Sequence, residues 1–111
     1  LLLTGRMLSG TEAAEMGLVS RALPAGEVLA AAMEMARDIA VNTAPVSVAL
    51  AKRLMWEGLN TGVDEMIATE GRIINKLASS PDSVEGVRAF FEKRTPEWSM
   101  KVSSDMDTYR K

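Results

Sequence analysis

The sequence has no cysteine and no histidine among its 111 residues. The absence of cysteine excludes disulfides, thiolate zinc sites and a cysteine nucleophile, and the absence of histidine excludes a Ser-His-Asp triad. Acid–base chemistry would therefore depend on carboxylates, lysines, the single Tyr109 or backbone groups. We expect no metal site, and the cytoplasm is the default compartment for a chain of this composition.

The sequence also lacks long apolar runs and a strong net charge. No run is long enough to span a membrane, and a net charge of −2 gives no electrostatic reason to expect binding to nucleic acid or to an anionic membrane. The remaining composition, with 47% hydrophobic and 25% charged residues, is ordinary for a globular protein. A length of 111 residues suits one domain.

The apolar pattern predicts a mainly α fold. Helical periodicity occurs in five segments: residues 9–17, 25–42, 43–60, 62–79 and 80–94. Residues 18–23, LVSRAL, alternate imperfectly, so we expect four to five helices with at most one short strand. After Pro96 the pattern fails, and we expect residues 99–111 to form a polar, mobile tail.

Several helix starts carry recognisable signals. Ser9 and Glu12 have the spacing of a capping box, in which each residue's side chain bonds the other's backbone N–H. Asp82 and Glu85 repeat this spacing at the start of the last helix. Thr43 is the expected cap of the third helix, since a threonine side chain can accept from the first free N–H groups of a helix.

The first residues predict that the chain is a piece of a longer protein. The opening LLLTG resembles the last turn of a helix that ends at Gly5, because glycine readily takes the left-handed conformation at that position. The alternative is a complete domain that was trimmed at its start.

The last helix carries the candidate binding residues. On a helical wheel Val84, Val87 and Phe91 share the stripe that we expect to face the core. Phe90 lies about 100° from Phe91, on the flank of that stripe. Lys93 is three residues beyond Phe90, so these two side chains are neighbours on the helix surface.

Two interpretations of Phe90 and Lys93 remain open from the residues alone. A ring beside the cations of Lys93 and Arg94 suits a flat anionic ligand, with a heteroaromatic base stacked on the ring and a phosphate at the ammonium. Alternatively, Phe90 packs on a neighbouring helix or subunit, and the cations complement the negative C-terminal end of the helix. Trp56 and Trp98 are further candidates for interfaces.

Three segments, taken in order, resemble a known family. LTGR (residues 3–6), EAAEMGLV (12–19) and EGVRAFFEKR (85–94) are similar to the C-terminal part of the enoyl-CoA hydratase/isomerase, or crotonase, family. The resemblance covers residues 1 to about 98. It implies that residues 1–98 form the helical, oligomer-forming and site-closing region of such an enzyme, without the family's N-terminal β-β-α superhelix core.

The resemblance implies no catalytic residue in this chain. In the family an oxyanion hole of backbone N–H groups and, in the hydratases, two glutamates lie upstream of the similar region. The implied parent is an enzyme that hydrates or isomerises a 2-enoyl-CoA, whereas we expect this chain alone to be inactive. We expect its own carboxylates to be structural, since acidic residues are favoured in the first turns of helices.

The resemblance also implies a ligand and a partner. The AFFEKR motif assigns Phe90 to the adenine side of coenzyme A and Lys93 to the 3′-phosphate. No tightly bound cofactor is expected, and the coenzyme A moiety belongs to the acyl-CoA substrate of the parent enzyme. The implied partner is the same chain, in a trimer or a dimer of trimers. The alternative is a free-standing helical module that self-associates and has no ligand.

Overall fold

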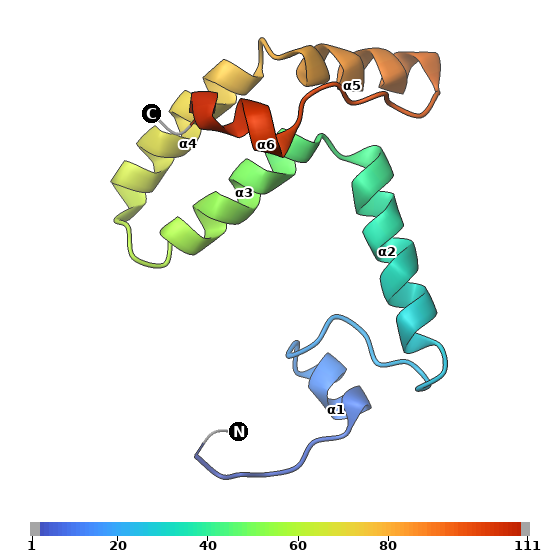
Figure 1. Ribbon diagram of the computed structural model, residues 1–111. Helices are drawn as coiled ribbons and strands as arrows, with labels where there is room; N and C mark the ends of the chain where they lie inside the picture. Colours follow the sequence, from blue (N-terminus) through green and yellow to red (C-terminus); the bar gives the residue numbers. More distant parts are fainter. Residues whose placement is uncertain (1–2, 110–111) are drawn as a thin grey trace. The chain divides into compact units, whose positions relative to one another are not determined.

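Helices make up most of the computed structural model, which describes residues 3–109 (Figure 1). Residues 16–27 and 93–101 form its two longer connections. They are α1 (Gly10–Glu15), α2 (Val28–Asn42), α3 (Pro45–Glu57), α4 (Val63–Leu77), α5 (Pro81–Glu92) and α6 (Val102–Asp105), followed by a 3-10 turn, η1 (Met106–Tyr109). No strand occurs within residues 3–109, so the mainly α fold class is confirmed. The chain divides into two compact units, the first ending at Ala36 and the second beginning at Arg37.

The first unit contains the short helix α1. Its N-terminus has the predicted capping box, because the Ser9 hydroxyl accepts from Glu12 N at 3.2 Å and the Glu12 carboxylate accepts from Ser9 N at 2.8 Å. After α1 the chain turns at Gly17, whose φ of 72° is left-handed. Leu18 N then donates to Ala13 O at 2.8 Å, which satisfies a carbonyl near the end of the helix.

Two expectations for the first unit have different outcomes. Residues 18–23 form no strand, because no second strand within residues 3–109 offers their N–H and C=O groups a ladder to join. Gly5 has the left-handed φ expected of a helix stop, at 61°. The helical turn predicted before it falls mainly on residues 1 and 2, which lie outside the described residues.

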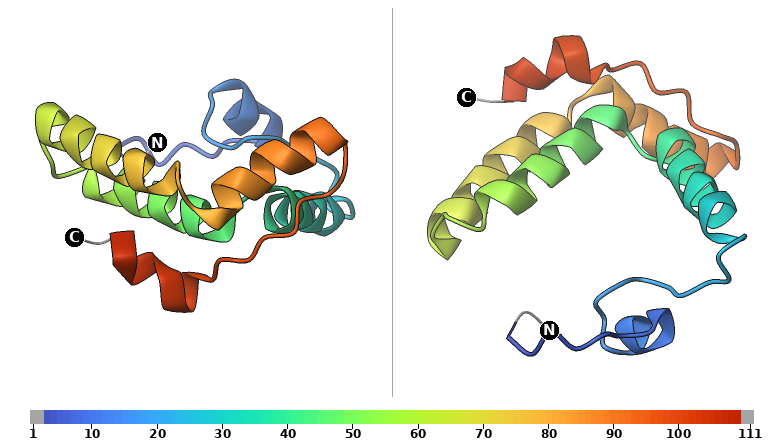
Figure 2. Two further views of the ribbon diagram at one scale, coloured as in Figure 1. Left: turned by 90° about the horizontal axis from the view of Figure 1, so that it is seen from above. Right: turned by 60° about the horizontal axis from the view of Figure 1, so that its bottom comes forward.

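The second unit has its core between α3 and α4, which lie side by side (Figure 2). Val46 and Leu50 on α3 are each 1% exposed, and Ile73 on α4 is 7% exposed. The spacing of four residues puts Val46 and Leu50 on the same face of α3. Leu54 and Leu77 extend this apolar cluster at its margin.

Residues 99–109, within the predicted polar tail, contain regular structure. They contain α6 and η1, and both elements contact α3. Met100, Met106 and Tyr109 pack against the core cluster of α3 and α4. These residues and Val102 are too few in a polar segment to show a helical period, so the pattern did not reveal these contacts. The mobility of residues 99–111 stays a prediction.

Two predicted caps form differently. The Thr43 hydroxyl donates to a carbonyl of the preceding helix at 2.6 Å, and α3 begins without a side-chain cap. At α5 the capping residue is Ser80, whose hydroxyl accepts from Ser83 N at 3.2 Å. Asp82 therefore does not form the predicted capping box, and its carboxylate is used elsewhere.

Large apolar side chains remain exposed on both units. No residue of α2 is buried, and its apolar side chains Val28 and Ile39 are exposed. Met55 and Trp56 of α3 are also exposed. Among the described helices none is long and apolar enough to cross a membrane. These surfaces are therefore available for contacts that residues 3–109 do not make among themselves.

Candidate functional site

The C-terminal end of α5 places Lys93 beside Phe90. The helix ends at Glu92, and Lys93 takes the left-handed conformation, with φ 55° and ψ 38°. Lys93 N donates to Phe90 O at 3.4 Å and Arg94 N donates to Ala89 O at 3.1 Å, which is the pattern of a Schellman motif. In this turn Lys93 Nζ lies 4.2 Å from the centroid of the Phe90 ring, within the range of cation–π attraction.

Both side chains of this pair are accessible. Phe90 is 68% exposed, and Lys93 is exposed as well. The pair thus presents an aromatic face and an ammonium group side by side at the surface. These are the two features that a flat ligand with an anionic group requires.

The assignment of Phe91 to the core is wrong within this chain. Phe91 is 75% exposed and lies edge-on to Phe90, with 5.7 Å between ring centroids and 76° between ring planes. Val84 and Val87, which share its stripe, are also mostly exposed. The buried side of α5 carries Ala89 instead.

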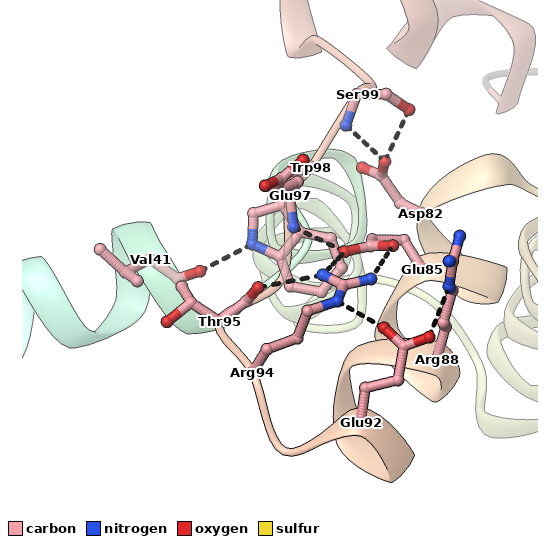
Figure 3. A network of polar contacts seen from close by, with 10 residues as sticks. All are labelled: Val41, Asp82, Glu85, Arg88, Glu92, Arg94, Thr95, Glu97, Trp98 and Ser99. Carbon is pink, nitrogen blue, oxygen red and sulfur yellow. Dashed lines mark hydrogen bonds and ion pairs between the residues drawn. The ribbon is translucent and has the colours of Figure 1, made fainter.

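Small residues explain which side of α5 is buried. A Cβ atom at Gly86 would lie 3.5 Å from the Trp98 ring, so the ring rests against the helix where side chains are small. Trp98 Nε1 also donates to Val41 O at 2.9 Å (Figure 3). Trp98, predicted at an interface, therefore packs within its own chain, whereas Trp56 is exposed.

Arg94 is held by carboxylates and by a carbonyl. Its Nη1 and Nη2 atoms form a bidentate pair with Glu85 at 2.5 and 2.9 Å, and its Nε donates to Glu92 at 2.6 Å (Figure 3). Nη1 also donates to Thr95 O at 3.1 Å. Glu92 accepts from Arg88 Nε at 2.8 Å through its other oxygen. Each nitrogen of the Arg94 guanidinium thus has an acceptor in this chain.

The network keeps the Glu85 carboxylate charged. Hydrogen bonds from the Arg94 guanidinium and from Glu97 N lower the pKa of Glu85 to about 2. Pairing with Glu85, and then with Glu92, raises the pKa of Arg94. Neither Glu85 nor Arg94 changes charge near neutral pH, so the pair is unsuited to proton transfer. Its hydrogen bonds connect the turn after α5 to the helix.

Asp82 ties the returning chain to the start of α5. It is 3% exposed, and its Oδ1 accepts from Ser99 N and Ser99 Oγ at 2.8 and 3.0 Å (Figure 3). The same oxygen also accepts from Met100 N at 3.2 Å. Its Oδ2 is buried and has no hydrogen-bond partner among the described residues. Asp82 therefore fixes the path of the chain beyond Trp98.

The carboxylate of Glu12 also has a structural partner. Hydrogen bonds from the backbone and the side chain of Ser9 lower the pKa of Glu12, as the capping box requires. Within residues 3–109 no group of three or more acidic side chains could hold a metal ion. Among the described residues, the carboxylates near the end of α5 are therefore engaged in structural contacts.

Comparison with known proteins identifies the family. Residues 1–101 match the sequence profile of the enoyl-CoA hydratase/isomerase family. The chain belongs to this family. A probable mitochondrial enoyl-CoA hydratase of Dictyostelium discoideum is 39% identical over 101 residues, which cover 91% of this chain and 36% of that protein. The human mitochondrial enoyl-CoA hydratase domain-containing protein 2 is also 39% identical, over 88% of this chain and 35% of its own length.

Solved structures of this family share the fold. A probable enoyl-CoA hydratase/isomerase from Mycobacterium abscessus superposes with a TM-score of 0.84 at 46% identity, covering 89% of this chain and 39% of that one. An enoyl-CoA hydratase from Bacillus anthracis gives a TM-score of 0.79 at 35% identity, covering 88% and 38%. The chain thus corresponds to the C-terminal helical region of this enoyl-CoA hydratase fold and spans little more than a third of the length of these relatives.

Sequence reasoning found the Phe90–Lys93 pair but missed the pairing of Glu85 with Arg94. In an uninterrupted helix, residues nine apart lie about 180° from each other around the axis, so the wheel separates Glu85 from Arg94. The left-handed turn at Lys93 ends the helix and lets Arg94 fold back to Glu85. A lysine gives no sequence signal for such a turn, because glycine is the usual residue there.

Proposed function

We propose that this enoyl-CoA hydratase/isomerase family chain closes the nucleotide end of the coenzyme A pocket in an enzyme that hydrates or isomerises 2-enoyl-CoA. The proposal is carried by the exposed ring of Phe90 with Lys93 Nζ 4.2 Å from its centroid. In the proposed complex the adenine base stacks on Phe90, and the Lys93 ammonium donates to the 3′-phosphate. Relatives named as enoyl-CoA hydratases support the acyl-CoA thioester as the substrate class.

The acid–base groups and the oxyanion hole for the reaction belong to the remainder of the enzyme under this proposal. The chain by itself should then not hydrate crotonyl-CoA. The assay measures hydration as the loss of enoyl absorbance. Turnover above a heat-inactivated control would contradict this division of roles.

Subunit contacts are the second role that we propose for the chain. An open apolar groove of about 500 Å³ on the second unit is lined by α3, α4, α5 and the Trp98 ring, with Ile74, Leu77 and Val87 among its residues. Exposed apolar surfaces of this kind favour association. The expected assembly of the enzyme is a homo-oligomer, as a trimer or a dimer of trimers.

Light scattering on the isolated chain tests the association. The chain should form oligomers at micromolar concentration, and a monodisperse monomer would contradict the proposed use of these surfaces. Association without any response to coenzyme A would favour the alternative, a helical self-association module that has no ligand.

Two substitutions in the full-length enzyme test the nucleotide site. Phe90→Ala should weaken binding of coenzyme A by about 1–2 kcal/mol through lost stacking, and Phe90→Leu should restore little of it because leucine has no ring. Lys93→Ala should cost about 1–3 kcal/mol if the ammonium bonds the 3′-phosphate. Lys52→Ala, which removes an exposed lysine from α3, is the matched control for charge.

The ligand comparison decides between phosphate recognition and a general effect of charge. Coenzyme A and its 3′-dephospho form should differ in affinity for the unmodified enzyme, and Lys93→Ala should remove most of that difference. The salt dependence of binding should also become flatter in this variant, since an exposed ion pair is screened. An equal loss for the two ligands would refute the assignment of Lys93 to the phosphate.

A further inference from the structure

Lys93 occupies a backbone conformation that a lysine does not favour. It is the one non-glycine residue within residues 3–109 that has a positive φ, at 55°. The left-handed region brings Cβ close to the following carbonyl oxygen in L-residues, whereas glycine has no Cβ and takes it without strain. The surrounding contacts must therefore stabilise this conformation.

The contacts of Arg94 supply that stabilisation from both sides of Lys93. Its guanidinium binds Glu85, in the first half of α5, through two parallel hydrogen bonds. It also binds Glu92, the residue before Lys93. Glu97 N donates to Glu85 at 2.7 Å, which secures the chain beyond the turn. One ion-pair network thus fixes the residues that precede and follow the strained position.

The ion pair of Glu85 and Arg94 is partly buried and bidentate. The side chains of Glu85 and Arg94 are 17% and 33% exposed. A bidentate arginine–carboxylate pair has a defined planar geometry, because both N–H groups meet both oxygens at once. This geometry restrains the chain next to Lys93, whose Nζ lies 4.2 Å from the centroid of the Phe90 ring.

We propose that Glu85 and Arg94 are positioning residues, which hold the turn at Lys93 so that its ammonium meets the anionic group of the coenzyme A nucleotide. This inference rests on the proposed function of Phe90 and Lys93. Arg94 does not itself bind the anion, because Glu85, Glu92 and Thr95 O already accept from its guanidinium nitrogens. The pair acts on the ligand through Lys93.

Glycine and alanine at position 93 separate the strain from the charge. Lys93→Gly and Lys93→Ala remove the same ammonium, but glycine accepts the left-handed conformation and alanine does not. Both variants should lose the same affinity for coenzyme A. Lys93→Gly should melt at a higher temperature than Lys93→Ala and than the unmodified enzyme, because the strain is relieved. A melting temperature for Lys93→Gly at or below that of Lys93→Ala would show that the turn is not strained.

A double-mutant cycle in the full-length enzyme tests the positioning role. Glu85→Gln keeps the shape of the side chain and removes its charge, so the bidentate pair is lost. We expect it to weaken binding of coenzyme A by about 3- to 10-fold when Lys93 is present and by less than about 2-fold in the Lys93→Ala background. The affinity for 3′-dephospho-coenzyme A should change little in either background. Arg94→Lys keeps the positive charge but cannot form the planar bidentate pair, and it should weaken binding in the same Lys93-dependent way. It replaces Glu85→Gln in the test if that variant does not fold.

The outcomes distinguish this inference from the function on which it rests. Equal losses for Glu85→Gln with and without Lys93 would mean that the pair is merely structural, and the positioning role would be overturned while the nucleotide site stands. Tighter binding in Glu85→Gln would mean that the released Arg94 is itself an anion ligand, which also overturns it. Unchanged binding of both ligands in Lys93→Ala would overturn the nucleotide site and the positioning role together.

Discussion

Replacing Asp82 with alanine should release the chain that follows Trp98. In the structure one oxygen of Asp82 accepts three hydrogen bonds, from the backbone and hydroxyl of Ser99 and from the backbone of Met100. Within residues 3–109, Asp82 is the carboxylate that accepts from the backbone N–H groups of Ser99 and Met100. Asp82 is therefore the acceptor that ties these two backbone N–H groups to α5, beside the packing of Met100 on the core cluster.

The magnitude follows from the number of bonds and their exposure. A hydrogen bond to a charged acceptor contributes about 1.5–3 kcal/mol. Ser99 is exposed and Met100 is only partly buried. Their donor groups can therefore form hydrogen bonds with water when Asp82 is removed. We therefore expect the Asp82→Ala substitution to cost about 2–4 kcal/mol, less than the sum of three such bonds. That cost corresponds to an increase of at least about 30-fold in the opening of this segment.

Hydrogen exchange of individual amides measures the release directly. The Ser99 and Met100 amides should exchange at least about 30-fold faster in Asp82→Ala if local opening governs their exchange. Asp82→Asn keeps an acceptor oxygen, so both amides should remain better protected than in the alanine variant. Asp64→Asn removes the same charge from the exposed first turn of α4 and serves as the control.

Trp98 provides a second measurement of the same event. With Trp56 replaced by phenylalanine, the remaining tryptophan reports on residue 98 alone, and its quenching by iodide should rise in Asp82→Ala. Unchanged exchange at Ser99 and Met100, together with unchanged quenching, would refute the conclusion that Asp82 holds this segment.

Three further predictions concern the core, a helix cap and pH. Leu50→Ala should destabilise the second unit by about 2–5 kcal/mol in denaturant titrations, because a fully buried side chain is lost, while Met55→Ala at an exposed site should change little. Ser9→Ala should cost about 1 kcal/mol and shorten α1, seen as faster amide exchange at Glu12. The pKa of Glu85, lowered to about 2, means that its pairing stabilises the fold fully above about pH 4.5 and loses this effect as the pH falls toward 2. Glu85→Gln should therefore flatten acid denaturation curves in that range, and curves identical to the parent would contradict the pairing.

The sequence was sufficient where a structural feature depends on neighbours within one or two helical turns. The capping box at Ser9, the left-handed glycine at position 5 and the long helices α2 to α5 are of this kind. The spacing of three residues also predicted the proximity of Phe90 and Lys93, which the structure has although Lys93 lies in the left-handed turn that ends α5. The family likewise could be inferred from the order of short motifs along the chain.

The same reasoning failed where a distant segment decides which face of a helix is covered. The apolar stripe of Val84, Val87 and Phe91 looked like the core face of α5, but the chain returns over Gly86 and Ala89 instead. A helical wheel identifies an apolar face without identifying its partner. Within this chain, the small side chains allow close approach of Trp98, and the apolar stripe stays exposed for contacts outside the described residues.

What the sequence alone determined is the five helices α1 to α5, the pair of side chains at the end of α5 and the family to which the chain belongs. Tertiary structure alone decided that Asp82 holds Ser99, that Met106 and Tyr109 pack on the core, and that Arg94 turns back to Glu85. The physical reason is range. Local propensity and spacing depend on a few consecutive residues, whereas these contacts depend on how chain segments meet, and a single left-handed residue changes the direction of everything that follows it.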